Sequence, residues 1–428
     1  MPDPYRLVRR VRDRAYWNAS PMNPSEPFLA RAAFYCAFAS ATAAVVSIAA
    51  AQTLLALALA ALLISGTRLR LPPIWLPLAL FILGTVVSLL LSENRAAGWP
   101  QIRKLFVFSM LLVVFSTFRR VREARWLVLA WTGAGTLASL LALGQFWRKL
   151  EEARQQGRGF YDYYIGERIT GFMSHWMTFS GLVVIVLLML AAFVLFSPRG
   201  RGKALALGLA AGAALGAALV LGMTRSMWLA GAGGGLYLLW VWKRKAVLAA
   251  PAAVVLGLLV APGSVRTRAT SIFQPRQQVD SNQHRIVCWR TGWEMIRAHP
   301  WFGVGPEMVG LKFNDYVPPD IPRPLPTGWY GHLHNVYLHY AAERGLPVML
   351  VLVWMLGKML WDFRRAARAL PPGPSDERFI LHGAAAVVVA TLISGLFELN
   401  LGDSEVLMTF LAVAACGYVA ADTTPGAA

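Results

Sequence analysis

Long apolar runs separated by short basic clusters are the feature that most constrains how this chain folds. Hydrophobic residues make up 57% of the 428 residues and charged residues 15%, whereas soluble domains contain about 25% charged residues. Runs of this length are typical of membrane-spanning helices, because only helices and closed barrels satisfy their backbone polar groups inside lipid. The composition excludes a soluble globular enzyme and a disordered chain. It predicts an all-α polytopic membrane protein.

The apolar runs predict about twelve transmembrane helices. They cover residues 33–50, 52–66, 72–92, 104–118, 126–147, 173–197, 203–222, 226–242, 246–262, 334–361, 379–397 and 404–421. A span needs about 20 residues, so the continuous run 32–66 is divided at Gln52 into a tight hairpin. Residues 104–118 are short for a span, and a re-entrant segment is the alternative there.

The basic clusters predict the orientation of these spans. With the N-terminus in the cytoplasm, the clusters fall on the cytoplasmic side, as the positive-inside rule requires. They include Arg68, Arg70, Arg119, Arg120, Arg122, Arg125, Arg199, Arg201, Lys203, Lys243, Arg244, Lys245, Arg364, Arg365, Arg368 and Arg378. The first span would then be an uncleaved signal anchor.

This orientation divides the chain into five parts. They are a basic cytoplasmic N-terminus (1–32), spans one to nine (33–262), a large periplasmic loop (263–333), spans ten to twelve (334–421) and a cytoplasmic tail (422–428). The large loop is rich in arginine, and a shorter outer segment precedes span six. Basic residues around an outer cavity indicate an anionic ligand. The net charge of +19 lies mostly in topology clusters and no nucleic-acid-binding motif is present, which argues against nucleic acid as a partner.

Histidines open the predicted tenth span, where the large loop re-enters the membrane. His332, His334 and Asn335 form a polar cluster there. His334 and Leu338 share a helix face at i,i+4, which predicts that His334 is directed into the bundle. A neutral imidazole at this place can act as a general base toward a hydroxyl. The alternative is an interfacial histidine that caps the helix.

Arginines supply the candidate anion-binding residues. Thr224-Arg225 is the only charged interruption of the run 203–242, and an arginine at membrane depth costs about 2.5–3.5 kcal/mol on insertion scales. At the outer turn of a hairpin, its guanidinium can bind phosphate through two parallel hydrogen bonds; the alternative is an arginine that snorkels to the interface. Arg285 and Arg290 lie on a predicted helix, 283–298, whose phase leaves open which one faces the cavity. Arg168, in the shorter outer segment, is a further candidate.

Several motifs are absent from the sequence. There is no Walker motif, no His-Glu-x-x-His and no Asp-x-Asp, and Cys36, Cys288 and Cys416 have no metal-site spacing. We therefore predict no metal and no cofactor. Acidic residues within the spans are scarce, which argues against an ion-coupled transporter.

Together these features resemble the bacterial O-antigen ligases, a family within a superfamily that also contains O-antigen polymerases and protein O-oligosaccharyltransferases. The spans and the large outer loop match its topology. The matching residues are His334, Asn335, Leu338 and Gly345 of a His-Asn-x-x-Leu-x6-Gly motif, the Arg285…Trp289…Ile296…Pro300…Gly303-Val304-Gly305 pattern, and Thr224-Arg225, where Ser-Arg is more usual.

The resemblance implies a glycosyltransferase of the bacterial inner membrane with a periplasmic active site. Its donor would be a glycan on undecaprenyl diphosphate, and its acceptor a sugar hydroxyl of lipid A–core. His334 would be the base, with Arg225 and Arg285 holding the diphosphate and Arg168 assisting, in one inverting and metal-independent displacement. An O-antigen polymerase or a protein O-oligosaccharyltransferase remains an alternative, and a polysaccharide or lipid transporter a more remote one.

Overall fold

The computed structural model describes residues 27–198, 202–271 and 282–424, and these residues form helices and no strand. The predicted basic N-terminus (through residue 26), Arg199, Arg201, Arg276 and the tail from residue 425 lie outside the described residues. The α-helices are α2 Phe28–Ala43, α3 Ile48–Ile64, α4 Trp75–Leu91, α5 Arg95–Lys104, α6 Ser109–Thr117, α7 Val121–Gln155, α8 Phe160–Gly166, α9 Trp176–Phe196, α10 Lys203–Leu221, α11 Arg225–Trp242, α12 Ala250–Val260, α13 Gly263–Thr270, α14 Asn282–Ala298, α15 Met308–Leu311, α16 Val336–Arg344, α17 Leu346–Ala369, α18 Asp376–Ser394 and α19 Ser404–Asp422. Short 3-10 helices are η1 Leu105–Phe108, η2 Arg244–Ala249, η3 Phe313–Asp315 and η4 Asn400–Gly402.

Seven helical stretches among the described residues are long and apolar enough to cross a membrane. They correspond to the predicted spans four, five, six, seven, ten, eleven and twelve. Shorter apolar helices, α2, α3 and α4, stand at the predicted spans one to three. The protein is therefore an α-helical membrane protein, while the count of twelve spans stays a prediction.

The first two predicted spans form a helical hairpin, but its turn is not at Gln52. Helix α2 ends at Ala43 and α3 begins at Ile48, with the Ser47 side chain accepting a hydrogen bond from the Ala50 amide at the N-cap. A serine is a strong N-cap residue, whereas Gln52 lies inside α3. The turn therefore ends at the N-cap residue Ser47, and the prediction that the chain turns at the polar Gln52 was wrong.

The fourth predicted span is longer than its apolar run. Helical structure continues from Arg95 to Thr117, a stretch of 23 residues, because the polar segment before Lys104 is also helical. At 1.5 Å per residue this covers about 35 Å, enough to cross a hydrocarbon core about 30 Å thick. The ninth predicted span, in contrast, contains an α-helix that is shorter than its apolar run. Its α-helical part, α12, has only 11 residues, which is about 17 Å.

The tenth predicted span is broken rather than continuous. Gly345 separates α16 from α17 with a φ of +88°, a conformation that favours glycine. The segment 300–305 crosses this break closely: the Val304 amide donates to the Ala342 carbonyl at 2.8 Å, and the Leu346 amide donates to the Pro300 carbonyl at 2.8 Å. A Cβ on Gly345 would lie 2.1 Å from the Trp301 carbonyl oxygen. Two glycine-containing motifs of the sequence are therefore parts of one close crossing.

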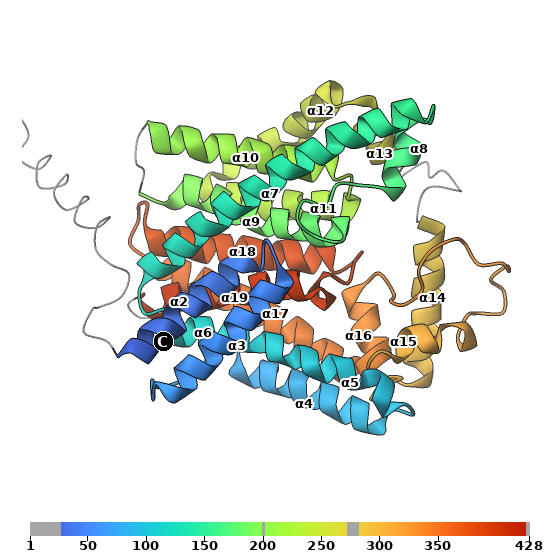
Figure 1. Ribbon diagram of the computed structural model, residues 1–428, viewed down its shortest axis with the longest axis horizontal. Coiled ribbons are helices and arrows are strands. Elements are labelled where there is room, and N and C mark those ends of the chain that lie inside the picture. The colour runs from blue at the N-terminus through green and yellow to red at the C-terminus, as the bar shows by residue number, and fades with distance from the viewer. Residues whose placement is uncertain (1–26, 199–201, 272–281, 425–428) are drawn as a thin grey trace, which may run out of the picture.

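The outer loop has a hydrophobic core of its own at one end of the bundle. Helices α14 and α15 lie at that end, with α8 and α13 nearby, and the C-terminus lies at the opposite end (Figure 1). The buried residues of this core include Val287, Met295, Val304, Phe313 and Leu333, packed against Ala341 and Ala342 of α16. The outer core thereby holds α14 against the helix that begins just after His334.

Candidate functional site

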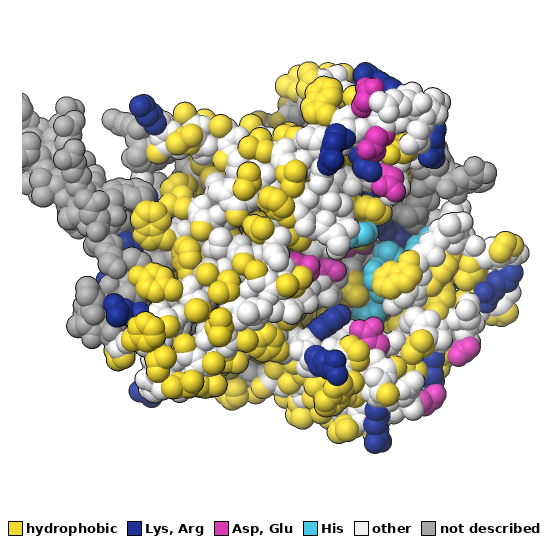
Figure 2. Space-filling view, viewed as in Figure 1, with side chains coloured by type: hydrophobic (Ala, Val, Ile, Leu, Met, Phe, Trp, Pro, Cys, Tyr) yellow, Lys and Arg dark blue, Asp and Glu magenta, His cyan; other side chains and the backbone are white. Residues whose placement is uncertain are grey.

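A cavity of about 1150 Å³ opens at this outer end of the bundle. Figure 2 shows histidine side chains gathered beside a hollow there, with acidic side chains close by. Six of the eight candidate residues line the cavity: Arg168, Thr224, Arg225, Arg285, His332 and His334. The two others, Arg290 and Asn335, are not among its lining residues. The fold thus brings together residues from four separate parts of the sequence.

His334 reaches the cavity from a strained turn and not from a helix face. Helix α16 begins at Val336 with Asn335 as its N-cap, so the predicted i,i+4 helix face shared by His334 and Leu338 is wrong. His334 itself has a left-handed φ of +48°, a conformation that costs about 1–3 kcal/mol for a residue other than glycine. The backbone turns at this residue, and the imidazole enters the cavity.

Asn335 holds the turn in place. Its side-chain oxygen accepts the Leu338 amide at 3.0 Å, and its amide nitrogen donates to the Leu396 carbonyl at 3.0 Å. The Val336 amide also donates to the Gly395 carbonyl, at 2.7 Å. The His-Asn pair is therefore joined to the segment between α18 and α19.

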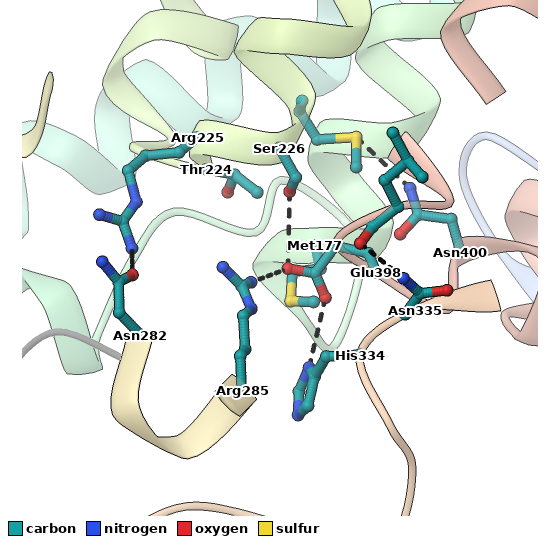
Figure 3. Close-up of polar contacts among 12 residues, drawn as sticks. Met177, Thr224, Arg225, Ser226, Asn282, Arg285, His334, Asn335, Glu398 and Asn400 are labelled. Atoms are coloured by element: carbon teal, nitrogen blue, oxygen red, sulfur yellow. Dashed lines mark hydrogen bonds and ion pairs between the residues drawn. The ribbon is translucent and has the colours of Figure 1, made fainter. Parts of the chain in front are cut away.

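That segment contributes Glu398, which the sequence analysis did not select as a site residue. Its side chain is 1% exposed and lies between His334 and Arg285 (Figure 3). One carboxylate oxygen is 3.5 Å from His334 Nδ1, and the other accepts from Arg285 Nη2 and, at 3.5 Å, from the Ser226 hydroxyl. In the sequence, Glu398 belongs to a short acidic turn that is predicted on the same face of the membrane as the candidate arginines. That shared face was the only indication that it could belong to the site.

The turn before α11, which begins at Arg225, resembles the turn before α16. The residue before its N-cap, Met223, has a left-handed φ of +47°, and Thr224 is the N-cap. The buried guanidinium of Arg225 donates to the Ser271 hydroxyl at 3.0 Å and to the Asn282 side-chain oxygen at 2.7 Å (Figure 3). These bonds place the cation beside the start of α14, where Arg285 lies.

Two more arginines converge on the Met223 turn. Arg168 Nη1 and Arg268 Nε both donate to the Met223 carbonyl, at 3.4 and 3.1 Å. Burial, together with the charge of Arg268, lowers the pKa of Arg168 to about 9, so it stays protonated at neutral pH. Arg268 also lines the cavity, although in the sequence it was only one of several cations in the large loop.

The phase of α14 decides between the two candidate arginines on this helix. Arg285 lines the cavity, whereas Arg290 forms an exposed ion pair with Asp320 at 2.8 Å. An exposed pair of this kind contributes about 0–1 kcal/mol. Of the two tryptophans of α14, Trp289 is partly buried and Trp293 is exposed.

Burial favours the neutral form of two cavity histidines, His332 and His284, by lowering their pKa values. Burial, with the neighbouring His334 and His339, lowers the pKa of His332 to about 2, and burial with His334 lowers the pKa of His284 to about 4. Neutral imidazoles offer lone pairs to protons or metal ions. The ligand atoms of His284, Cys288 and His334 lie within 4.8 Å of one another, a grouping that the cysteine spacing gave no reason to expect.

A comparison with protein families matches a segment that contributes part of the cavity lining. Residues 210–353 match the family model described as O-antigen ligase. A search of curated proteins finds no match to the chain. The matched segment contains Thr224, Arg225, Arg285, Arg290, His332, His334 and Asn335, whereas Arg168 and Glu398 lie outside it. Residues 210–353 are thus similar to the O-antigen ligase family, and this match supports an assignment to the O-antigen ligase/polymerase superfamily.

Proposed function

We propose that this protein is an O-antigen ligase: it transfers a glycan from undecaprenyl diphosphate to a sugar hydroxyl of lipid A–core at the periplasmic face of the inner membrane. The observation that carries the proposal is the contact chain from His334 through Glu398 to Arg285, beside Arg225 in one cavity. A base and cations within one water-accessible space are what this displacement requires.

The arginines would hold the donor diphosphate. Arg168 donates to the Met223 carbonyl, and Arg225 donates to Ser271 and Asn282. These bonds fix both guanidinium groups beside the cavity that they line. Arg285 adds a cation whose Nε is buried and has no hydrogen-bond partner among the described residues. Phosphate oxygens suit the fixed fork of guanidinium donors. The arginines would stabilise the negative charge that grows on the diphosphate as it leaves.

His334 would take the proton from the acceptor hydroxyl. Its Nδ1 faces Glu398, while Nε2 is buried and has no hydrogen-bond partner among the described residues. The acceptor oxygen would attack the anomeric carbon as the bond from that carbon to the phosphate oxygen breaks, with inversion in a single displacement. The carboxylate of Glu398 would orient the imidazole and stabilise it once protonated. No step of this scheme uses a metal.

A gel of lipopolysaccharide tests the proposal. A strain that lacks the gene is compared with strains complemented by the wild type and by His334→Ala. We expect core without attached O-units in the deletion and in His334→Ala, because loss of a general base costs about 10²–10⁴-fold in rate. Core that carries a single repeat would instead identify a polymerase. An unchanged ladder would contradict both readings and favour a protein glycosyltransferase or a transporter.

A further inference from the structure

We propose that His284, Cys288 and His334 form a binding site for a thiophilic divalent cation, of which Zn²⁺ fits best, and that the bound ion blocks transfer. The three residues combine two imidazoles and one thiol, the ligand types that zinc prefers. The inhibitory effect rests on the proposed role of His334 as the base, whereas the metal site stands on its own geometry.

The spacing of the ligand atoms suits a tetrahedral ion. His284 and Cys288 are at i,i+4 on α14, and the His284 Nε2 to Cys288 Sγ distance is 3.7 Å. Zinc bonds of about 2.0–2.3 Å place two tetrahedral ligands about 3.3–3.8 Å apart. All three ligand atoms lie within 4.8 Å of one another, so His334 needs to approach by about 1 Å.

The surroundings of both histidines match those of metal ligands. A ligating histidine usually has its second ring nitrogen bonded to a carboxylate or to the backbone. His334 has Glu398 at Nδ1, which leaves Nε2 for an ion, and Nε2 is buried without a partner among the described residues. His284 has a hydrogen bond with the backbone of Trp329, and its ring packs on Tyr330 with the centroids 4.5 Å apart.

Three protein ligands leave a fourth position for water or substrate. Binding of the ion would displace the thiol proton of Cys288 into solvent and form a metal–sulfur bond. The ion would also occupy the lone pair of His334 that a base needs for the acceptor proton. A cation at this site is therefore an inhibitor.

Cobalt spectroscopy tests the site without using activity. Tag-free, full-length protein in detergent is titrated with Co²⁺, which gives a thiolate-to-metal absorption band and the intense visible bands of tetrahedral coordination. We expect both in the wild type, their loss on addition of Zn²⁺, and loss of the thiolate band in Cys288→Ser. The matched control is Cys36→Ser, which changes a half-buried cysteine of α2 and should keep every band.

His284→Gln provides a second variant should Cys288→Ser fold poorly. It should weaken Co²⁺ binding at least tenfold while leaving the α-helical circular dichroism unchanged. The absence of a thiolate band in the wild type, or its persistence in Cys288→Ser, would overturn the metal site.

Inhibition of transfer is measured separately from binding. Zn²⁺ should stop transfer by the wild type, a chelator should restore it, and Cys288→Ser should need at least tenfold more Zn²⁺ for half inhibition of its own activity. A cobalt band with no inhibition by Zn²⁺ would establish the site and contradict the role of His334 as the base. No band would overturn the metal site and leave the His334→Ala experiment as the test of the proposed function.

Discussion

The two walls of the cavity hold their charges in different ways. On the arginine wall (Arg168, Arg225 and Arg268), guanidinium groups donate to carbonyl, hydroxyl and amide oxygens. On the histidine wall (Arg285, His334 and Glu398), a buried carboxylate contacts both an imidazole and a guanidinium. Guanidinium donors suit phosphate oxygens, whereas a carboxylate beside an imidazole suits proton transfer. Under the proposed function, the arginine wall would bind the diphosphate and His334 with Glu398 would transfer the proton, while Arg285 would contact both Glu398 and the diphosphate.

Both walls use the same backbone device to present their residues. Met223 and His334 each adopt a left-handed conformation directly before the N-cap of a helix. Residues other than glycine in this region cluster at functional sites, where the surrounding structure supports the strain. Here the support comes from arginines on the Met223 carbonyl and from Asn335 on the Leu396 carbonyl. The contacts that stabilise these two strained turns therefore lie in the cavity or next to it.

Among conservative substitutions, one on the arginine wall is expected to have the larger effect. Arg225→Lys keeps the charge but loses the fork that binds two oxygens at once. The loss of one charge-assisted hydrogen bond, about 1.5–3 kcal/mol, lowers the rate roughly 10–100-fold. The measurement is kcat/KM for transfer from lipid-linked donor by purified protein. Arg290→Lys, in the exposed pair with Asp320, is the matched control and should remain within about twofold of wild type. Equal losses in the two variants would remove the distinction between the cavity arginine and the surface arginine.

The histidine wall predicts a smaller effect at Glu398. Glu398→Gln keeps the shape and a hydrogen bond to His334 but removes the negative charge. A neutral hydrogen bond is weaker than a charged one by about 1 kcal/mol, so kcat should fall about fivefold. KM for the donor should not rise, because the arginine wall is intact and Arg285 keeps its charge.

The control for Glu398 is Glu405→Gln, which changes another carboxylate that lines the cavity. It should leave kcat near the wild-type value. A fall in both variants would show that the overall charge of the cavity matters, and not the contact with His334.

The smallest expected effect is a change in stability when Asp403 is substituted. Its carboxyl lines the cavity and accepts the Thr178 hydroxyl at 2.9 Å. Burial raises its pKa from 3.8 to about 6. Because the folded protein favours the protonated acid, the penalty is absent below about pH 4, grows as the pH rises, and is complete above about pH 6. Asp403→Asn should therefore raise the Tm in detergent at pH 7 by a few degrees, but not at pH 4. A shift of the same size at both values would contradict a buried, titrating carboxyl.

The class of fold and six of the residues that line the cavity could be predicted from the sequence alone. Span length and hydrophobicity are local properties, because lipid requires each helix to satisfy its own backbone. Helical periodicity is likewise a local pattern, and the helix of the outer loop, predicted at 283–298, lies at Asn282–Ala298. Local polarity also marked Arg225 and His334, since charged or ionisable groups at the edge of an apolar run are costly, whereas Arg285 was selected from its predicted helix and from the family resemblance.

Which of those residues contact one another depends on tertiary packing. Glu398 is 64 positions from His334 and 113 from Arg285, and its contacts arise when the segment after α18 packs against the start of α16. The phase of α14 set Arg285 toward the cavity and Arg290 toward Asp320, because the outer core buries one face of this helix. The same packing brings His284 and Cys288 to His334. Contacts of this kind depend on which helices pack together, and a local pattern of residues does not predict which helices do so.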